Sequence, residues 1–295
     1  MKNYLAIDIG GSALKYGIIN DKGKILYSIK QEHKLQNITD LKTEIIKKYQ
    51  QYQEEYNFEA LSISAPGAVN SQSKIIYGAS ALPFIHENNW VNELEQELKL
   101  KVYIENDANC AALCEQWLGN GKNCQNIINI VLGTGVGGAL IINGELVKGK
   151  NLYGGELGFQ IIDYNKPQQV LSEVLSTSAL VKRVNKFVPV KNGLEVFAYY
   201  DQGNDQVIKE VEKHYQDLAI FCYNLMHIFD PDIILIGGAI SQREELIDKI
   251  QQKYANILQN SISDLELMIN KCKFNNKSNL LGAVYHAKRV EIKGE

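Results

Sequence analysis

The sequence lacks the features that mark membrane-spanning, exported and nucleic-acid-binding proteins. Its longest apolar run, Ile127 to Ile142, contains Asn129 and several glycines and is too short to span a bilayer comfortably. Asp8 interrupts the apolar amino-terminal segment before it reaches the length of a signal-peptide core. A formal net charge of −3 gives no basic footprint for nucleic acid. We therefore expect a cytoplasmic protein with neither a membrane nor a nucleic-acid partner.

Paired cysteines are also missing. The five cysteines lack the Cys-x-x-Cys spacing of a structural zinc site, and their number is odd. Cys110 and Cys114, four residues apart in an expected helix, are better explained as small buried side chains than as metal ligands. We expect all five to be reduced thiols. With 295 residues, 45% of them apolar, the chain is typical of a globular protein with two domains around a cleft.

The most informative feature is one pattern that occurs once in each half of the chain. Residues 5–23 read LAIDIGGSALKYGIINDKG, and residues 128–144 read INIVLGTGVGGALIING. Each segment predicts a strand, a glycine turn, a second strand and a polar turn. Two ordinary β-hairpins would explain either segment alone, but the recurrence at matched spacing favours two phosphate-binding hairpins. Glycine turns of this kind expose successive backbone N–H groups, which can hold phosphate oxygens.

Other segments predict the elements around these hairpins. The spacing of apolar residues in 39–56 is typical of an amphipathic surface helix. Ser241 and Glu244 have the spacing of a capping box for a helix near the carboxyl terminus. Apolar runs and periodic segments further predict strands at 60–65, 102–104 and 233–236, and helices at 108–117, 176–184 and 204–229.

Four motifs, by their residues and by their order along the chain, resemble those of the ROK group (repressors, open reading frames and kinases) of actin-like sugar kinases. The resemblance extends from about Leu5 to about Ala287. DIGGSALK and LGTGVGGAL resemble its two phosphate loops, IGGAIS its adenosine motif and ENDANCAAL its catalytic segment. The resemblance implies a duplicated α/β fold of the actin-like, ribonuclease H-like type, with two domains around a nucleotide and sugar cleft. We expect a smaller domain at 1–118, a larger one at 119–279, and a helix at about 280–292 that packs back on the first.

The resemblance also implies an ATP- and Mg²⁺-dependent kinase that phosphorylates a sugar. Asp8 is expected to hold Mg²⁺ through water. The residues expected to contact ATP are Asp8, Gly10, Gly11, Ser12, Lys15, Gly133, Thr134, Gly135, Gly237 and Gly238, and those expected to contact the sugar are Gly67, Asn106, Asp107, Glu156 and Glu173.

Asp107 is the expected catalytic base. Phosphoryl transfer needs a positioned carboxylate that accepts the proton of the attacking hydroxyl group. We expect Asp107, at the start of a helix, to be favoured as the anion that a base requires. Asn106 or Asp107 also lies near the helix cap, and capping alone would explain either residue.

The chain departs from the family pattern after Glu156. Phe159 stands where the family's GExGH element has histidine, and the cysteine-rich zinc segment is missing, so we expect no structural zinc. Ser172 stands where a sugar-binding glutamate usually lies, and Glu173 is the neighbouring substitute. The ring of Phe159 offers a stacking surface for an aglycone or a second sugar.

Similarity to zinc-free members therefore favours a β-glucoside kinase acting on the 6-hydroxyl group, with N-acetylmannosamine kinase and glucokinase-type hexokinase as alternatives. A sugar-sensing ROK repressor would need a helix-turn-helix segment before the core, whereas the first core strand is expected from about residue 4. An actin-like assembly or chaperone ATPase would need neither the ENDAN helix nor the loop around Glu156. The resemblance further implies a homodimer.

Overall fold

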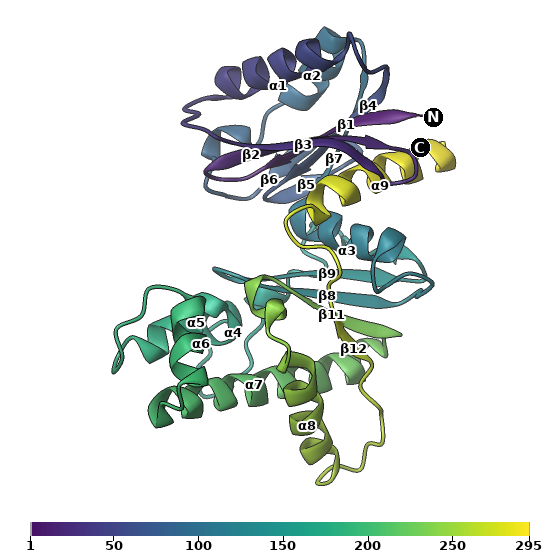
Figure 1. Ribbon diagram of the computed structural model, residues 1–295. Coiled ribbons are helices and arrows are strands. Elements are labelled where there is room, and N and C mark those ends of the chain that lie inside the picture. The colour runs from purple at the N-terminus through teal and green to yellow at the C-terminus, as the bar shows by residue number, and fades with distance from the viewer. Residues whose placement is uncertain (1, 295) are drawn as a thin grey trace. The chain divides into compact units, whose positions relative to one another are not determined.

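The computed structural model describes residues 2–294, which divide into two compact units (Figure 1). The first unit takes the chain up to Gly119, together with Gly149–Tyr153 and the segment from Asn276 onward. The second consists of Asn120–Lys148 and Gly154–Asn275.

The first unit is built on a five-stranded sheet in the order β3-β2-β1-β4-β7. The first three strands form an antiparallel meander, and β4 and β7 continue the sheet parallel to β1. Their bounds are β1 Asn3–Ile9, β2 Ala13–Asn20, β3 Ile25–Glu32, β4 Phe58–Ala65 and β7 Lys101–Asn106, with a small hairpin of β5 Ala68–Asn70 and β6 Ile75–Tyr77 and a 3-10 turn, η1, at Pro83–Ile85.

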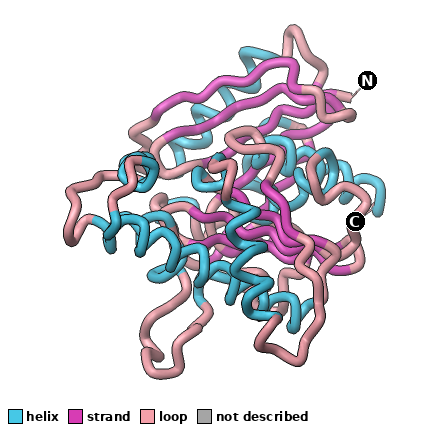
Figure 2. Tube along the Cα trace, turned by 60° about the horizontal axis from the view of Figure 1, so that its bottom comes forward, coloured by secondary structure: helices cyan, strands magenta, loops and turns pink. Residues whose placement is uncertain are grey.

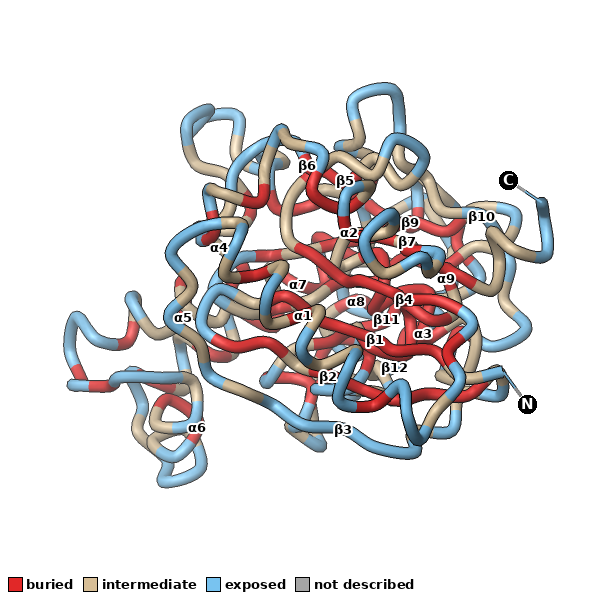
Figure 3. Tube along the Cα trace, turned by 90° about the horizontal axis from the view of Figure 1, so that it is seen from above, coloured by how far each residue is buried: buried red, intermediate tan, exposed pale blue. Residues whose placement is uncertain are grey.

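Helices cover both faces of this sheet. Helices α1 (Ile38–Tyr52) and α2 (Trp90–Leu98) lie on one face, and α3 (Asp107–Leu118) and α9 (Ser278–Lys293) lie on the other (Figure 1). The central strands β1 and β4 are accordingly buried along almost their whole length, as expected of strands covered on both faces. Figure 3 shows this burial along β1 and β4, whereas the edge strand β3 is largely exposed.

Close packing of α9 against α3 depends on a glycine. A Cβ atom on Gly282 of α9 would lie 1.7 Å from the carbonyl oxygen of Cys110 in α3, so a larger residue would push the helices apart. Helix α9 also contacts β1, β4 and β7, which ties the carboxyl-terminal segment to the central strands of the first unit.

The second unit repeats the same sheet, with the order β10-β9-β8-β11-β12. Again a meander is followed by two strands parallel to its innermost strand. Apolar side chains of helices α7 and α8 share one core with those of β8 and β11. The two helices run beside this sheet (Figure 1), and Figure 2 shows the same backbone with helices in cyan and strands in magenta. The bounds are β8 Ile127–Leu132, β9 Val136–Ile142, β10 Glu145–Leu146, β11 Ile233–Gly237, β12 Ile269–Lys271, α4 Ser172–Leu175, α5 Thr177–Val184, α6 Gly193–Asp201, α7 Asp205–Phe229 and α8 Leu246–Leu258, with 3-10 turns η2 at Leu157–Phe159 and η3 at Ala239–Gln242.

The predicted duplication is confirmed, because the two glycine hairpins, β1–β2 and β8–β9, occupy equivalent places in sheets of the same order. The predicted helices at 176–184 and 204–229 are confirmed as α5 and α7, each begun by a side-chain cap, Ser176 and Asn204. The expected strands correspond to β4, β7 and β11.

The amphipathic helix expected at 39–56 is confirmed as α1, but it ends at Tyr52. One local prediction is wrong. Ser241 and Glu244 do not form a capping box, because the chain first makes the turn η3 and the next helix begins only at Leu246. The Ser241 hydroxyl group instead donates to the carbonyl oxygen of Gly238, at 2.8 Å.

Among the helices within residues 2–294, none is both long enough and apolar enough to cross a lipid bilayer.

Candidate active site

In the first unit, the turn Gly10-Gly11-Ser12 links β1 to β2. A hydrogen bond closes the turn: the Gly10 amide donates to the Ala13 carbonyl oxygen at 3.0 Å. Gly11 and Ser12 are exposed at the tip of the turn. A Cβ atom on Gly11 would lie 2.8 Å from the Cβ atom of Ala81, so a residue with a side chain would force a shift of either segment.

Asp8 lies just before this turn, almost fully buried, and strand register decides its neighbours. Lys15 is directly opposite Asp8 on β2, and Ser64 is opposite it on β4. Because residues opposite one another project from the same face of a sheet, the three side chains meet. The Lys15 ammonium group lies 2.9 Å from Asp8 Oδ2, and the Ser64 hydroxyl group donates to Asp8 Oδ1 at 2.9 Å.

Asn279, in the first turn of α9, completes the surroundings of Asp8. Its amide group donates to Asp8 Oδ1 at 3.0 Å. Sequence reasoning missed both Ser64 and Asn279. The polar Ser64 in a buried apolar strand was a usable signal, but nothing local connects Asn279 to a residue 271 positions away.

Asn106, rather than Asp107, caps α3. The backbone of Asn106 is extended, and its Oδ1 accepts a hydrogen bond from the Asn109 amide at 3.1 Å. Its Nδ2 donates to the Gly67 carbonyl oxygen at 3.0 Å. One side chain therefore fixes the start of α3 and holds it against the loop that contains Gly67.

Asp107 is the first residue of α3, and its Oδ1 accepts a hydrogen bond from the Ala108 amide at 2.8 Å. Burial raises the pKa of Asp107 to about 6, and the charge of Asp8 adds to the rise. The helix start does not lower the pKa below its ordinary value, because removal of water outweighs the backbone N–H groups that lower the pKa, but the anion still predominates at neutral pH. A pKa near neutrality suits a general base.

A buried glutamate supports this strand-to-helix turn from beneath. Glu105 Oε1 accepts hydrogen bonds from the Asn106 amide at 2.8 Å and from Asn109 Nδ2 at 3.0 Å. His286 of α9 approaches the other carboxylate oxygen, with 3.8 Å between Nδ1 and Oε2. Strand β7, α3 and α9 are thus fixed together directly below Asp107.

Gly67 has a backbone that only glycine adopts readily, with φ +104°. A Cβ atom there would also lie 2.8 Å from both His86 Cε1 and Ile76 Cγ2. The Gly67 loop is therefore packed closely against the β5–β6 hairpin and the segment around His86, beside Asn106.

In the second unit, the turn Gly133-Thr134-Gly135 links β8 to β9, with Thr134 and Gly135 exposed. Three residues around α4 and α5 hold it. Ser172 Oγ accepts from the Val136 amide at 3.0 Å, and Thr177 Oγ1 donates to the Leu132 carbonyl oxygen at 3.2 Å. The Ser178 amide donates to the Gly133 carbonyl oxygen at 3.3 Å. Ser172 therefore braces this hairpin from the position where the family usually has a glutamate.

Gly237 and Gly238 lie beside the same hairpin. Gly238 has φ +93°, and a Cβ atom on it would lie 2.1 Å from the Leu132 carbonyl oxygen. A Cβ atom on Gly237 would lie 3.1 Å from the sulfur of Cys272. The chain after β11 can approach the end of β8 this closely because Gly238 lacks a side chain, and Gly237 leaves room for Cys272.

The Glu156 loop packs along β9. A Cβ atom on Gly158 would lie 2.1 Å from the Val136 carbonyl oxygen and 2.4 Å from Ser172 Oγ. Glu156 therefore lies two residues from a tight contact with the glycine hairpin, and the adjacent Phe159 is 65% exposed.

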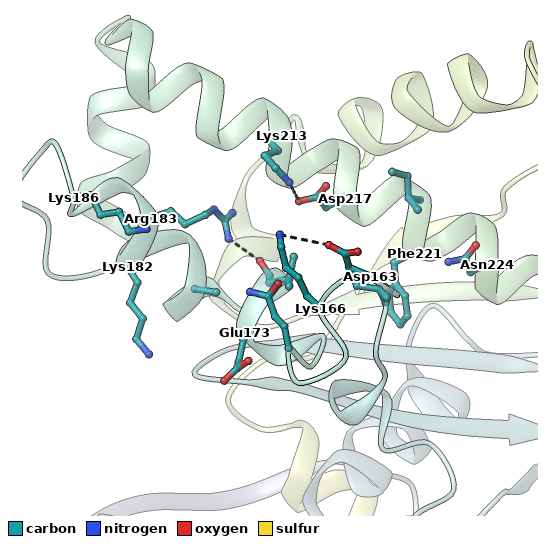
Figure 4. Close-up of a pocket in the computed structure, with 15 residues that line it drawn as sticks. Asp163, Lys166, Glu173, Lys182, Arg183, Lys186, Lys213, Asp217, Phe221 and Asn224 are labelled. Atoms are coloured by element: carbon teal, nitrogen blue, oxygen red, sulfur yellow. Dashed lines mark hydrogen bonds and ion pairs between the residues drawn. The ribbon is translucent and has the colours of Figure 1, made fainter.

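Glu173 is placed differently from its neighbour Ser172. It lines a cavity of about 620 Å³ in the second unit, between α5, α7 and the loop at 162–169 (Figure 4). In Figure 4 its carboxylate points away from the cluster of Arg183, Lys166 and Asp163. The lysines and arginine at the centre have acidic partners, since Lys166 lies 3.4 Å from Asp163 and Arg183 lies 2.9 Å from Glu210.

Within residues 2–294, no three or more His, Cys, Asp or Glu side chains gather as a metal site would require. The five cysteines are free thiols, and Cys110, Cys114 and Cys222 are buried. Mg²⁺ usually takes one or two protein carboxylates and completes its shell with water and substrate phosphates. Asp8 is a carboxylate of this kind, and its Oδ2 is paired with the Lys15 ammonium group.

Comparison with known proteins gives consistent matches over the whole chain. The sequence model of the ROK family matches residues 4–290. A beta-glucoside kinase from Listeria innocua is 31% identical over 299 residues, covering 98% of this chain and 99% of the relative. A ROK family protein from Streptococcus pneumoniae TIGR4, solved in complex with sucrose, has a TM-score of 0.90 and 29% identity, with 99% of each chain covered. A Listeria monocytogenes protein described as a candidate N-acetylmannosamine kinase has a TM-score of 0.86 and 30% identity, covering 98% of this chain and 99% of that one.

Proposed function

Because the chain belongs to the ROK family, we propose that it transfers the γ-phosphoryl group of ATP to the 6-hydroxyl group of a β-glucoside such as cellobiose. It is a carbohydrate kinase with the actin-like fold, since relatives named beta-glucoside kinase match it over nearly the full length and its two sheets repeat one strand order. We propose the identity of the sugar, the hydroxyl group that attacks and the roles of individual residues.

The observation that carries the proposal is the state of Asp107. A carboxylate with a pKa of about 6 at the start of a rigid helix is ionised at neutral pH, yet basic enough to take a proton from a hydroxyl group in the transition state. Its neighbour Asn106 is fixed by two hydrogen bonds, and Glu105 holds the turn from below. We assign Asp107 as the base, with Asn106, Gly67 and Glu156 at the sugar.

The two glycine turns are the proposed phosphate-binding elements. Gly10, Gly11 and Ser12 in one unit would contact the phosphates through backbone N–H groups, as would Gly133, Thr134 and Gly135 in the other. Asp8 would hold Mg²⁺ through water, and the ion would neutralise charge on the phosphates as the transfer proceeds. Lys15 would approach a phosphate oxygen, and Gly237 and Gly238 would lie against the adenosine.

Three facts favour a β-glucoside over a free monosaccharide. Relatives named beta-glucoside kinase match nearly the whole chain, and a similar solved structure holds the disaccharide sucrose. Phe159 is largely exposed beside Glu156 and offers a ring face for stacking a second sugar or an aromatic aglycone. Glu173 has no part in this assignment, because its carboxylate lines the cavity of Figure 4 while Ser172 contacts the hairpin.

N-acetylmannosamine is the second candidate, favoured by the Listeria monocytogenes structure described above. Glucokinases are also among the relatives, at 26% identity. We further infer a cytoplasmic homodimer without a nucleic-acid partner. The exposed apolar side chains Ile161, Ile162 and Tyr164, in the segment that replaces the family's zinc element, support self-association, and the net charge of −3 argues against nucleic acid.

A coupled ADP-release screen tests the function. Cellobiose, aryl β-glucosides, N-acetylmannosamine, glucose and fructose are compared with ATP alone. We expect ADP release only with sugar, and the highest kcat/KM with a β-glucoside. A higher value with N-acetylmannosamine or glucose would reassign the substrate, and ADP release that ignores sugar would identify an ATPase of another class.

A further inference from the structure

His33 contacts the first glycine turn at the carbonyl groups of its first and last residues, Gly10 and Ser12. It follows the last residue of β3, and its backbone amide donates to the Ser12 carbonyl oxygen at 3.1 Å. The ring reaches back to the other end of the turn, where Nε2 lies 2.9 Å from the Gly10 carbonyl oxygen. One residue thus brackets Gly10-Gly11-Ser12.

The hydrogen-bond partners of the ring fix its tautomer. A carbonyl oxygen only accepts, so Nε2 must carry the proton in the contact with Gly10. Nδ1 accepts from the Leu35 amide at 3.4 Å, which is consistent with a neutral ring protonated at Nε2. The Leu35 contact also sets the orientation of the ring, so the donor is aimed at Gly10 before any ligand arrives.

The geometry of the peptide bond converts this contact into a direction for the neighbouring donor. In a trans peptide the C=O of one residue and the N–H of the next point to opposite sides. With the Gly10 carbonyl group turned towards His33, the N–H of Gly11 points away from the imidazole, towards the opposite side of the turn. Without such a contact, Gly10 and Gly11 have access to many backbone conformations. Restricting them to one conformation when phosphate binds would cost conformational entropy and so weaken the binding.

We propose that the His33 imidazole is a positioning residue for ATP, which holds the Gly10–Gly11 peptide so that the Gly11 N–H faces the phosphates. The proposal rests on the proposed function, in which this turn binds phosphate. The backbone bond from His33 to Ser12 is independent of the side chain, so substitutions at this position isolate the contribution of the ring.

The test uses three variants of the full chain. His33→Phe keeps a planar ring but removes the donor, His33→Gln supplies an amide N–H that can reach the Gly10 carbonyl group, and Lys34→Ala is a matched control at the exposed neighbouring position. Sugar and ATP KM values, affinity for a non-hydrolysable ATP analogue by calorimetry, and thermal midpoints are measured on each.

We expect His33→Phe to raise the ATP KM and the analogue Kd about 3- to 10-fold, the usual effect of losing one hydrogen bond. The sugar KM should stay unchanged, His33→Gln should recover most of the loss, and Lys34→Ala should resemble the wild type. Unchanged analogue affinity in His33→Phe would overturn the proposal, as would an equal rise in both KM values or a lower midpoint without a change in Kd. A wild-type protein that releases no ADP with any sugar would instead refute the proposed function, while the analogue titration would still decide the role of His33.

Discussion

At the scale of single residues, Asp107 shows how the environment overrides position in the chain. A helix start favours a carboxylate anion by at most a modest free energy, whereas loss of water opposes the charge more strongly. The result is a pKa of about 6 rather than a lowered value. Since Asn106 caps α3, helix capping does not explain why an aspartate occupies position 107.

Asp107→Asn should therefore lower kcat about 10²- to 10⁴-fold, the usual contribution of a positioned base. Folding should not suffer, because Asn106 keeps the cap. Removing a buried ionisable group should leave the thermal midpoint at pH 7 equal or higher. Kinetics, sugar calorimetry and a thermal scan on one preparation check this. Retention of more than about a tenth of kcat would contradict the base assignment.

The pH dependence follows from the same pKa. The base must be ionised, so kcat/KM should be constant near pH 7 to 8 and fall about tenfold per unit below about pH 6. The contribution of Asp107 to folding stability changes with pH in the opposite direction to the rate. The folded pKa lies above the ordinary value of about 3.9, so this group stabilises the fold below about pH 4 and loses that contribution as the pH rises through about 6. Rate profiles from pH 5 to 8 would show a flat line if another group were the base.

Glu156→Gln should raise the sugar KM about 10- to 100-fold, because hydrogen bonds to a charged acceptor contribute more than those to a neutral one. The ATP KM should not change, since both glycine turns keep their contacts. Steady-state kinetics with each substrate varied in turn provides the measurement. A parallel rise in both constants would mean that Glu156 only supports the loop.

At the scale of elements, the site is built where strands end and helices begin. Asp8 and Ser64 come from neighbouring parallel strands, and Asn106 and Asp107 come from the next strand and its helix. Such junctions place backbone amides and polar side chains at one edge of the sheet, which is where ligands bind in open α/β folds.

Asn106→Ala tests the most important of these junctions. It removes both the cap of α3 and the contact with Gly67, and should lower the free energy of unfolding by about 1 kcal/mol. Asn106→Ser is the matched variant, because serine caps a helix but does not reach the Gly67 carbonyl group. Urea denaturation of both variants separates the contribution of the helix cap from that of the Gly67 contact. If the serine variant is as unstable as the alanine variant, the Gly67 contact rather than the cap stabilises the junction.

At the scale of the whole molecule, the duplicated sheet gives each unit one glycine hairpin followed by parallel strands. The segment at 160–171 contains no cysteine, and an isolated β-bridge joins Ile161 to Val170 within it. Arg183 joins α5 to α7 through its hydrogen bond to Glu210.

The protein should accordingly contain no tightly bound zinc. Metal analysis after dialysis should give far less than one zinc per chain, and treatment with a strong chelator should leave the thermal midpoint unchanged. A stoichiometric zinc, or a midpoint that falls after chelation, would show that residues elsewhere in the chain replace the family's ligands.

The sequence alone determined the two hairpins, the alternation of strands and helices, and the motifs that identify the family. These features depend on periodicity and turn chemistry, which act over a few neighbouring residues. It also singled out Asp8 and Asp107 as acidic residues beside glycine turns or helix starts.

Only the tertiary structure decided how those residues behave. The pairing of Asp8 with Lys15, Ser64 and Asn279 depends on strand register and on a helix from the far end of the chain. The pKa of Asp107 depends on everything packed around it, because desolvation sums over all nearby atoms, whatever their position in the sequence. Whether Asn106 or Asp107 caps α3, and whether Ser172 or Glu173 faces the hairpin, depends on backbone angles that composition and spacing do not encode.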